Sequence, residues 1–166
     1  ILDHWEGYRG SSPVRVGNGA ADQLQLDIYG EAFDSFYFAD QYGVEAGYRG
    51  WRHISDILGW LADNWNQPEE GIWETRGGRQ DFTYGRLMSW VAFDRGIRLA
   101  DRHGRPAPLD RWRAERDAIY NQIMDAGWSE ERQAFVQHPK TNVLDSSLLR
   151  MTSVGFISPK DPMWTS

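Results

Sequence analysis

The feature that most constrains the fold is a series of amphipathic helical patterns along the chain, with almost no strand-type alternation. Apolar residues recur at steps of three and four, as in Ile54, Leu58 and Leu61, and this is the spacing of one face of a helix. Such patterns predict four long helices that begin at intervals of about 30 residues. Their expected ranges are 20–39, 51–64, 80–102 and 109–126.

The recurrence of helical hairpins predicts an all-α fold, either a solenoid or a ring of paired helices. No residue-level repeat consensus is visible, which favours the ring. In a ring, alternate helices are inner and outer. The helices over 20–39 and 80–102 follow Gly-rich loops, so we expect them to be the inner ones, with functional loops at their N-terminal ends. Asp94 interrupts the apolar stripe of the third helix, and the pattern does not explain it.

The remaining segments carry weaker patterns. We expect a hairpin or loop over 129–138 and a short helix over 146–151. No run approaches the roughly 18 consecutive apolar residues of a membrane-spanning helix.

The charge balance limits the classes of partner. The chain has 24 acidic and 18 basic residues, which leaves a formal net charge of −6. This average charge repels duplex nucleic acid and anionic membrane surfaces, so neither is expected as a partner.

The chain has no cysteine, which excludes disulfides, thiolate zinc sites and a Cys nucleophile. This composition fits a reducing compartment, and we predict a cytoplasmic location. The four His residues lack the spacing of metal ligands. The Gly77-Gly78 pair is not followed by the Lys-Ser/Thr of a phosphate loop. We therefore expect neither a metal nor a cofactor.

Aromatic side chains make up 14% of the chain and include nine Trp residues. One explanation is a core filled with large side chains. The other is a sugar site, because pyranose C–H faces stack on indole and phenol rings while Tyr O–H and Trp N–H groups stay free for hydrogen bonds. Composition alone leaves both open.

Glu74, at the end of the stretch Gly71-Ile72-Trp73-Glu74, is the candidate catalytic acid. Glycoside hydrolysis uses two carboxyl groups, one of which protonates the leaving oxygen. A Glu beside a Trp suits that role, because apolar burial disfavours the carboxylate and raises the pKa. The alternative is a Glu that caps or solvates the start of the following helix.

Longer motifs around these residues resemble the bacterial branch of glycoside hydrolase family 15. They are GYRGSSPVRVGN at 7–18, QLQLDIYGE at 23–31 and EGIWETRGGRQ at 70–80. The resemblance covers nearly the whole chain, and the family holds glucoamylases, glucodextranases and some trehalases. It implies an (α/α)6 barrel, in agreement with the paired helices. It also implies inversion of the anomeric centre by two glutamates, with Glu74 in the position of the acid.

The resemblance implies further site residues. The loop around Tyr8, Arg15 and Asn18 is similar to one that lines the sugar pocket, where an Arg can hold several hydroxyl groups with its fixed fork of donors. The alternative for Arg15 is a structural ion pair.

Trp73 is similar to a pocket wall beside the acid, with core packing as the alternative. Arg76 and Gln80 either reach the pocket or lie at a solvated helix start. Thr75 stands where fungal members carry a second acid, which places starch-type specificity in doubt.

In that family the general base comes from late in the barrel, beyond Ser166, and the first inner helix precedes Ile1. We therefore expect residues 1–166 to be a fragment of a single (α/α)6 catalytic domain. Its substrate would be an α-glucoside or oligosaccharide, but the fragment would not hydrolyse it alone. It would pair with the remainder of its own barrel or self-associate. The alternative is a non-catalytic α-helical scaffold or carbohydrate-binding module.

Overall fold

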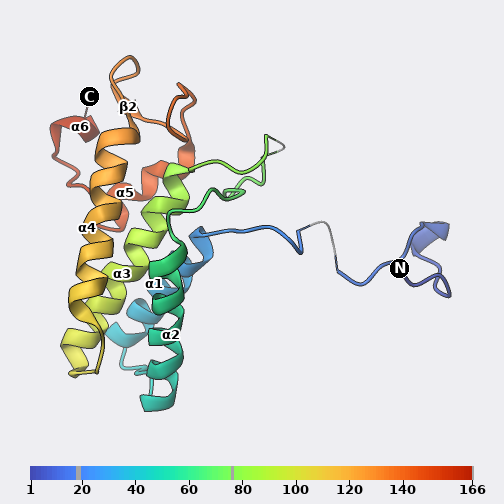
Figure 1. The fold of residues 1–166 in the computed structure, drawn as a ribbon, viewed down its shortest axis with the longest axis horizontal. Helices are drawn as coiled ribbons and strands as arrows, with labels where there is room; N and C mark the ends of the chain where they lie inside the picture. Colours follow the sequence, from blue (N-terminus) through green and yellow to red (C-terminus); the bar gives the residue numbers. More distant parts are fainter. Residues whose placement is uncertain (18–19, 76, 166) are drawn as a thin grey trace.

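A computed structural model describes residues 1–17, 20–75 and 77–165. Its body consists of four long helices (Figure 1): α1 (Asp27–Gln41), α2 (Tyr48–Asn64), α3 (Thr83–His103) and α4 (Leu109–Ala126). The all-α fold class and the presence of four long helices are confirmed, although the first of them begins later than expected. The regular interval is wrong, because the helices begin unevenly along the chain.

Short elements follow α4. The antiparallel hairpin of β1 (Trp128–Ser129) and β2 (Ala134–Phe135) comes first. The expected short helix is present as η2 (Ser146–Leu149), which continues into α5 (Arg150–Ser153), and α6 (Pro162–Thr165) comes last.

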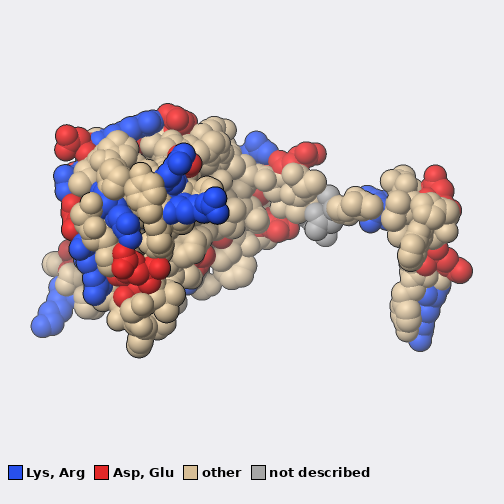
Figure 2. All heavy atoms as spheres, turned by 90° about the horizontal axis from the view of Figure 1, so that it is seen from below, with Lys and Arg blue, Asp and Glu red and all other residues tan. Residues whose placement is uncertain are grey.

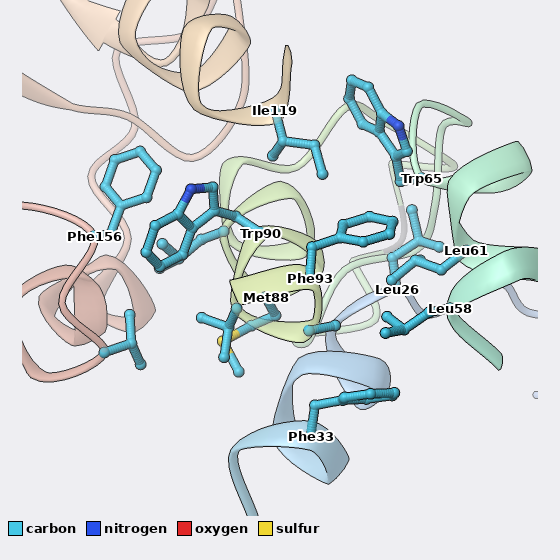
Figure 3. Packing of buried hydrophobic residues seen from close by; sticks show 14 of the residues in the cluster. Leu26, Phe33, Leu58, Leu61, Trp65, Met88, Trp90, Phe93, Ile119 and Phe156 are labelled. Carbon is cyan, nitrogen blue, oxygen red and sulfur yellow. The ribbon is translucent and has the colours of Figure 1, made fainter. Parts of the chain in front are cut away.

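The third helix, α3, forms the centre of the body and is buried along almost its whole length. It packs against α1 on one side and α4 on the other (Figure 1), and its side chains Met88, Trp90 and Phe93 lie within the apolar cluster (Figure 3). α1 comes close at Gly30, where a β-carbon would overlap the backbone of Met88. A residue without a side chain is therefore needed there, and α1 and α3 lie side by side as expected for two inner helices.

The second helix, α2, is amphipathic and buries one stripe. Trp51, Ile54, Leu58 and Leu61 are buried at steps of three and four residues. Ile57, which adjoins this stripe, is 38% exposed. One-sided burial is the arrangement of an outer helix, in contrast to the nearly complete burial of α3.

The first helix begins at Asp27 rather than near residue 20. The N–H of Leu24 donates to the side chain of Glu70, and the N–H of Leu26 donates to that of Glu69. The N–H groups of Leu24 and Leu26 are thus satisfied by carboxyl groups from a distant loop and do not need helical acceptors.

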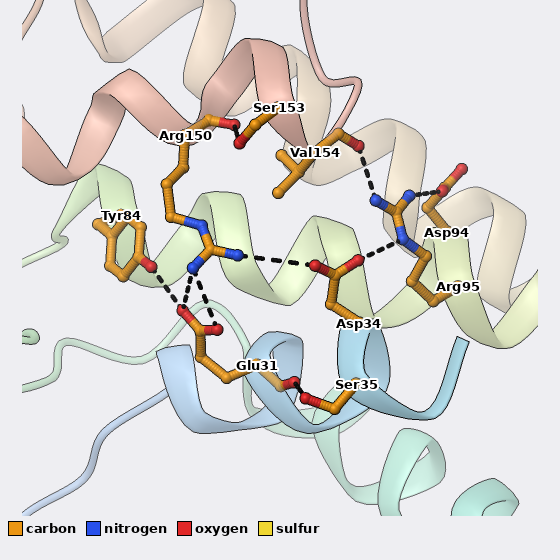
Figure 4. Close-up of polar contacts among 9 residues, drawn as sticks. All are labelled: Glu31, Asp34, Ser35, Tyr84, Asp94, Arg95, Arg150, Ser153 and Val154. Atoms are coloured by element: carbon orange, nitrogen blue, oxygen red, sulfur yellow. Dashed lines mark hydrogen bonds and ion pairs between the residues drawn. The ribbon is translucent and has the colours of Figure 1, made fainter. Parts of the chain in front are cut away.

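Asp94 is buried and paired with two arginines, which explains its place among apolar residues. Its Oδ2 atom lies 2.5 Å from Nη1 of Arg95 and 2.7 Å from Nε of Arg98. Arg95 also donates to Asp34 of α1 and to the carbonyl of Val154, which follows α5 (Figure 4). Buried charges are tolerated when they are paired in this way, and this network ties the three segments together.

The N-terminal arm, residues 1–17, projects away from the helical body (Figure 1, Figure 2). It contains one 3-10 turn, η1 (Tyr8–Gly10), and its described backbone hydrogen bonds are internal, such as Leu2 N–H to the carbonyl of Val14 at 2.7 Å. Among the described residues, no hydrogen bond or ion pair joins the arm to the body. Charges of both signs are mixed on the face of the body seen in Figure 2.

The four helices form part of a helical toroid, and large apolar side chains stay exposed on it. Phe38 is 64% exposed, Tyr42 at the end of α1 is 73% exposed, and Leu149 of η2 is 68% exposed. In the described part of the chain, no helix combines the length and apolarity needed to cross a membrane.

Candidate active site

The motif over 70–80 folds into a loop that a backbone pair closes at its base. The N–H of Glu69 donates to the carbonyl of Gln80, the N–H of Gln80 donates to the carbonyl of Glu69, and both distances are 2.9 Å. Inside the loop, Gly71 has a φ of +72°, and a β-carbon there would lie 2.7 Å from the ring of Phe82. Glycine is therefore required at this turn for both backbone conformation and space.

Glu74 completes the turn, since its N–H donates to the carbonyl of Gly71 at 3.1 Å. Its side chain is exposed, and Oε1 accepts a hydrogen bond from Nε2 of Gln25 at 3.2 Å. The burial expected beside Trp73 is not what the structure shows. Glu74 does not cap the next helix either, because α3 begins only at Thr83.

Trp73 is 55% exposed and so is not a core residue. Its indole Nε1–H donates to Oδ1 of Asp145 at 2.9 Å. Burial alone would raise the pKa of Asp145, but hydrogen bonds from Trp73, Ser147 and Gln137 outweigh it and lower that pKa. Asp145 is thus a carboxylate that fixes the orientation of the indole.

The motifs at 23–31 and 70–80 meet just before α1. The N–H of Leu24 donates to Oε2 of Glu70 at 2.7 Å, and the N–H of Glu70 donates to the carbonyl of Leu24 at 3.0 Å. Arg79 donates to Oε1 of Glu70 at 2.9 Å and to the carbonyl of Asp22 at 2.7 Å. These contacts hold the loop that carries Glu74 against the start of α1.

Glu69 lies beneath this junction and is fully buried. Its Oε2 atom accepts the N–H of Leu26 at 3.2 Å and the N–H of Gly71 at 3.0 Å. Burial raises the pKa of Glu69 to about 7, although these two hydrogen bonds act in the opposite direction. The negative charge of Asp27 adds to the shift, and burial raises the pKa of Asp27 as well.

One turn further along α1, Glu31 joins a second polar cluster (Figure 4). The Tyr84 hydroxyl donates to Oε1 of Glu31 at 2.7 Å, and Nη1 of Arg150 lies 3.3 Å from both carboxylate oxygens. Burial, followed by the bond to Glu31, raises the pKa of Tyr84. The cluster connects α1, α3 and α5, while the side chains of Glu31 and Arg150 remain 42% and 41% exposed.

The other predicted site residues are not brought together with Glu74. Tyr8 and Arg15 are exposed on the N-terminal arm, which extends away from the loop (Figure 1). Arg15 makes no ion pair among the described residues, so the structural alternative is not seen there. Asn18 and Arg76 lie outside the described residues.

Gln80 takes part through its backbone, while its side chain is exposed. Among the residues with described positions, no group of three or more His, Asp or Glu side chains could hold a metal ion.

Three residues that contact the turn were not predicted: Gln25, Glu69 and Asp145. Gln25 lies inside the motif at 23–31, so the motif itself was the available signal. Glu69 stands next to Glu70, and no local pattern distinguishes the buried acid from its neighbour. Asp145 is 72 positions from Trp73, and no spacing rule links residues so far apart.

Comparisons with known proteins agree on one family. Glycosyl hydrolases family 15 matches residues 2–164. The chain is 36% identical over 157 residues to a trehalase of Thermoplasma acidophilum, a match that covers 95% of this chain and 27% of that protein. It is 38% identical over 161 residues to a trehalase of Mycobacterium tuberculosis, covering 97% of this chain and 24% of that protein.

The chain thus spans about a quarter of the length of these curated relatives. A comparison with solved structures gave no significant match.

Proposed function

Because the chain belongs to glycosyl hydrolase family 15, we propose that residues 1–166 are part of a single (α/α)6 catalytic domain that hydrolyses terminal α-glucosidic bonds with inversion. The observation that carries this proposal is the turn at 71–74. It is held against the start of α1 through contacts of Glu70 and Gln25, so that Glu74 lies in a fixed turn near the start of that helix.

Glu74 is the proposed general acid. It gives its proton to the glycosidic oxygen as the bond from that oxygen to the anomeric carbon breaks. A water molecule attacks the anomeric carbon from the opposite face and loses a proton to a second carboxylate. That carboxylate would come from the remainder of the polypeptide and stand about 6.5–9.5 Å from Glu74, the separation that leaves room for the water.

Substrate contacts are assigned on the resemblance. Trp73 would form a wall beside the acid, with its exposed indole face available for a sugar ring. Tyr8 and Arg15 would line the pocket from the N-terminal arm, and Asn18 and Arg76 would also line it. In this proposal the remainder of the barrel brings the arm to the loop.

The proposed first substrate is trehalose, because the relatives described above are named trehalases. Maltooligosaccharides and isomaltooligosaccharides are the other α-glucosides to compare. Thr75 supplies no second acid on the leaving-group side, which argues against starch as the preferred substrate.

The second candidate is a non-catalytic helical scaffold or carbohydrate-binding module. The exposure of the Glu74 carboxyl group favours it, because a general acid is usually placed where burial raises its pKa. The two candidates differ in what Glu74 must do, so a substitution there distinguishes them.

The test uses the complete polypeptide and a panel of α-glucosides, with the product anomer followed by NMR. With trehalose, inversion should release equal amounts of β-glucose, from the attacked anomeric carbon, and α-glucose, from the leaving group. We expect a fall in kcat of about 10²–10⁴-fold for Glu74→Gln. Glu115→Gln is the control, because Glu115 lies on α4 and its hydrogen-bond partner is Trp65 rather than a residue of the turn at 71–74. Unchanged kcat in Glu74→Gln, or α-glucose as the sole first product from trehalose, would overturn the proposal.

The isolated 166-residue chain is expected to hydrolyse no glycoside, since it would lack the general base. Turnover by this chain that Glu74→Gln abolishes would show this expectation to be wrong. Through the exposed Phe38, Tyr42 and Leu149, the chain is expected to self-associate or to pair with the remainder of the barrel. Light scattering with and without that remainder tests this. A cytoplasmic location stays a prediction, testable by cell fractionation.

A further inference from the structure

Glu69 is a buried acid at the point where three segments of the chain converge. Its backbone closes the loop through the pair with Gln80. Its side chain reaches the start of α1 at Leu26 and the turn at Gly71 through a single oxygen, Oε2. Two amides from distant parts of the sequence are therefore held by one carboxyl group.

Each of these two amides lies next to a group that contacts Glu74. Gly71 offers its carbonyl to the N–H of Glu74 at 3.1 Å. Leu26 follows Gln25, whose side-chain amide donates to the Glu74 carboxyl group at 3.2 Å. Glu69 is thus connected to the candidate acid by two short routes, one within the turn and one through α1.

The other oxygen, Oε1, is packed against α3. A β-carbon at Gly85 would overlap it, so the carboxyl group has no room to move toward that helix. Oε1 is buried and has no hydrogen-bond partner among the described atoms. A group this enclosed keeps its position only while the amides that it binds keep theirs.

We propose that Glu69 is a positioning residue for Glu74: its buried carboxyl group sets the turn at Gly71 against the start of α1, so that Gln25 and Glu74 meet in one fixed geometry. The inference rests on the proposed function for its catalytic consequence. The claim that Glu69 holds the turn against the start of α1 rests only on the observed contacts.

The surrounding charges predict which substitutions preserve this role. Asp27 on α1 raises the pKa of Glu69, and Arg86 on α3 acts in the opposite direction. Burial is the largest cause of the raised pKa, which is about 7, so the neutral acid is well populated near neutral pH. A neutral carboxyl group keeps Oε2 as an acceptor for both amides, and a Gln side chain does the same. Leu fills a similar volume and accepts no hydrogen bond.

The experiment compares E69Q and E69L in the complete polypeptide with trehalose as substrate. We expect E69L to lower kcat about 10–100-fold with KM changed less than about 3-fold, because displacement of a reacting group by about 1 Å can cost about 100-fold. E69Q should retain kcat within about 3-fold of the wild type, since it keeps both hydrogen bonds. A loss in E69Q as large as in E69L would overturn the inference.

E115L is the matched control, because it removes a carboxylate on α4 whose hydrogen-bond donor is Trp65 and not Leu26 or Gly71. It should reduce stability with kcat per folded molecule unchanged. If E69L behaves in the same way, Glu69 is only structural and the inference is wrong. If E69L does not fold, E69D replaces it, because the shorter side chain withdraws Oδ from both amides and should lower kcat in the same manner.

Amide hydrogen exchange separates this inference from the proposed function. Exchange at Leu26 and Gly71 should be at least 10-fold faster in E69L or E69D than in the wild type and in E69Q. If the wild type hydrolyses no α-glucoside, the proposed function fails while this exchange pattern still supports the positioning role. If the wild type is active and exchange is the same in all variants, only the positioning role fails.

Discussion

The loop over 69–80 and the N-terminal arm over 1–17 both lie within the part of the chain that matches glycosyl hydrolase family 15, yet they differ in how they are bonded to the helical body. The loop is bonded to the start of α1 through backbone and side-chain contacts of Glu69, Glu70 and Gln25. The arm is bonded to itself and extends into solvent (Figure 1). Two segments can therefore resemble the same family and still differ in whether they are bonded to the helical body. A loop takes its position when a second segment offers partners for its polar groups.

The largest effect is expected in the pH dependence of the free energy of unfolding. The pKa of Glu69 is raised from an ordinary value of 4.5 to about 7, so its contribution to stability is full below pH 4.5 and is lost as the pH rises to about 7. The shift corresponds to about 3 kcal/mol. The free energy of unfolding of the complete polypeptide, relative to Glu69→Gln, should fall by that amount between pH 4 and pH 8.

The raised pKa of Asp27 also makes the free energy of unfolding fall as the pH rises. The lowered pKa values of Glu70 and Asp145 contribute stability above the ordinary pKa of these groups, and that stability is lost as the pH falls below it. The comparison with Glu69→Gln isolates Glu69 from all three. A difference between wild type and variant that does not vary with pH would mean that burial does not raise the pKa of Glu69 as the structure indicates.

A second test concerns the close contact between Gly85 of α3 and the buried Glu69 side chain. Gly85→Ala places a methyl group on Oε1 of Glu69, and we expect a loss of about 1–3 kcal/mol in the free energy of unfolding. Gly59→Ala in α2 is the control, because a β-carbon there meets nothing within 4 Å. Alanine should stabilise that helix by about 0.5–1 kcal/mol. Denaturant unfolding measures the stability of both variants. A Gly85→Ala variant as stable as the wild type would contradict the expected loss.

A third test compares one indole in each region. Trp73→Phe removes the hydrogen bond to Asp145, and we expect a loss of about 0.5–1.5 kcal/mol in the free energy of unfolding. Trp5→Phe on the arm is the matched change, because Trp5 is 64% exposed and its indole makes no hydrogen bond among the described residues. Trp5→Phe should leave the free energy of unfolding unchanged. An equal loss of this free energy in both variants would show that the loop and the arm do not differ in the way proposed.

The smallest effect is expected for Arg15→Ala. Arg15 is exposed and pairs with no acid in the described ranges, so the free energy of unfolding of the complete polypeptide should change by less than about 0.5 kcal/mol. A Km for trehalose that rises in the same variant would support its proposed pocket role. A stability loss above about 1 kcal/mol would show instead that the arm is bonded as firmly as the loop.

Much of the fold was predictable because it depends on short-range patterns. The buried stripe of α2 follows from the spacing of Ile54, Leu58 and Leu61, and the central place of α3 is consistent with its long apolar pattern. The start of α1 was misplaced because the N–H groups of Leu24 and Leu26 find acceptors on a loop that lies more than 40 positions away. Patterns of neighbouring residues cannot predict hydrogen-bond partners that lie so far apart in the sequence.

The sequence by itself determined the helical fold class, the family and the choice of Glu74 as the candidate acid, because periodicity and a contiguous motif are properties of neighbouring residues. Only the tertiary structure decided which acids are buried and which segments meet. It placed Glu69 in the interior and Glu74 at the surface of the same loop, and it brought Gln25 to the latter. The physical reason is that burial and hydrogen bonding between distant segments depend on how the helices pack, which the residues of one loop cannot specify alone.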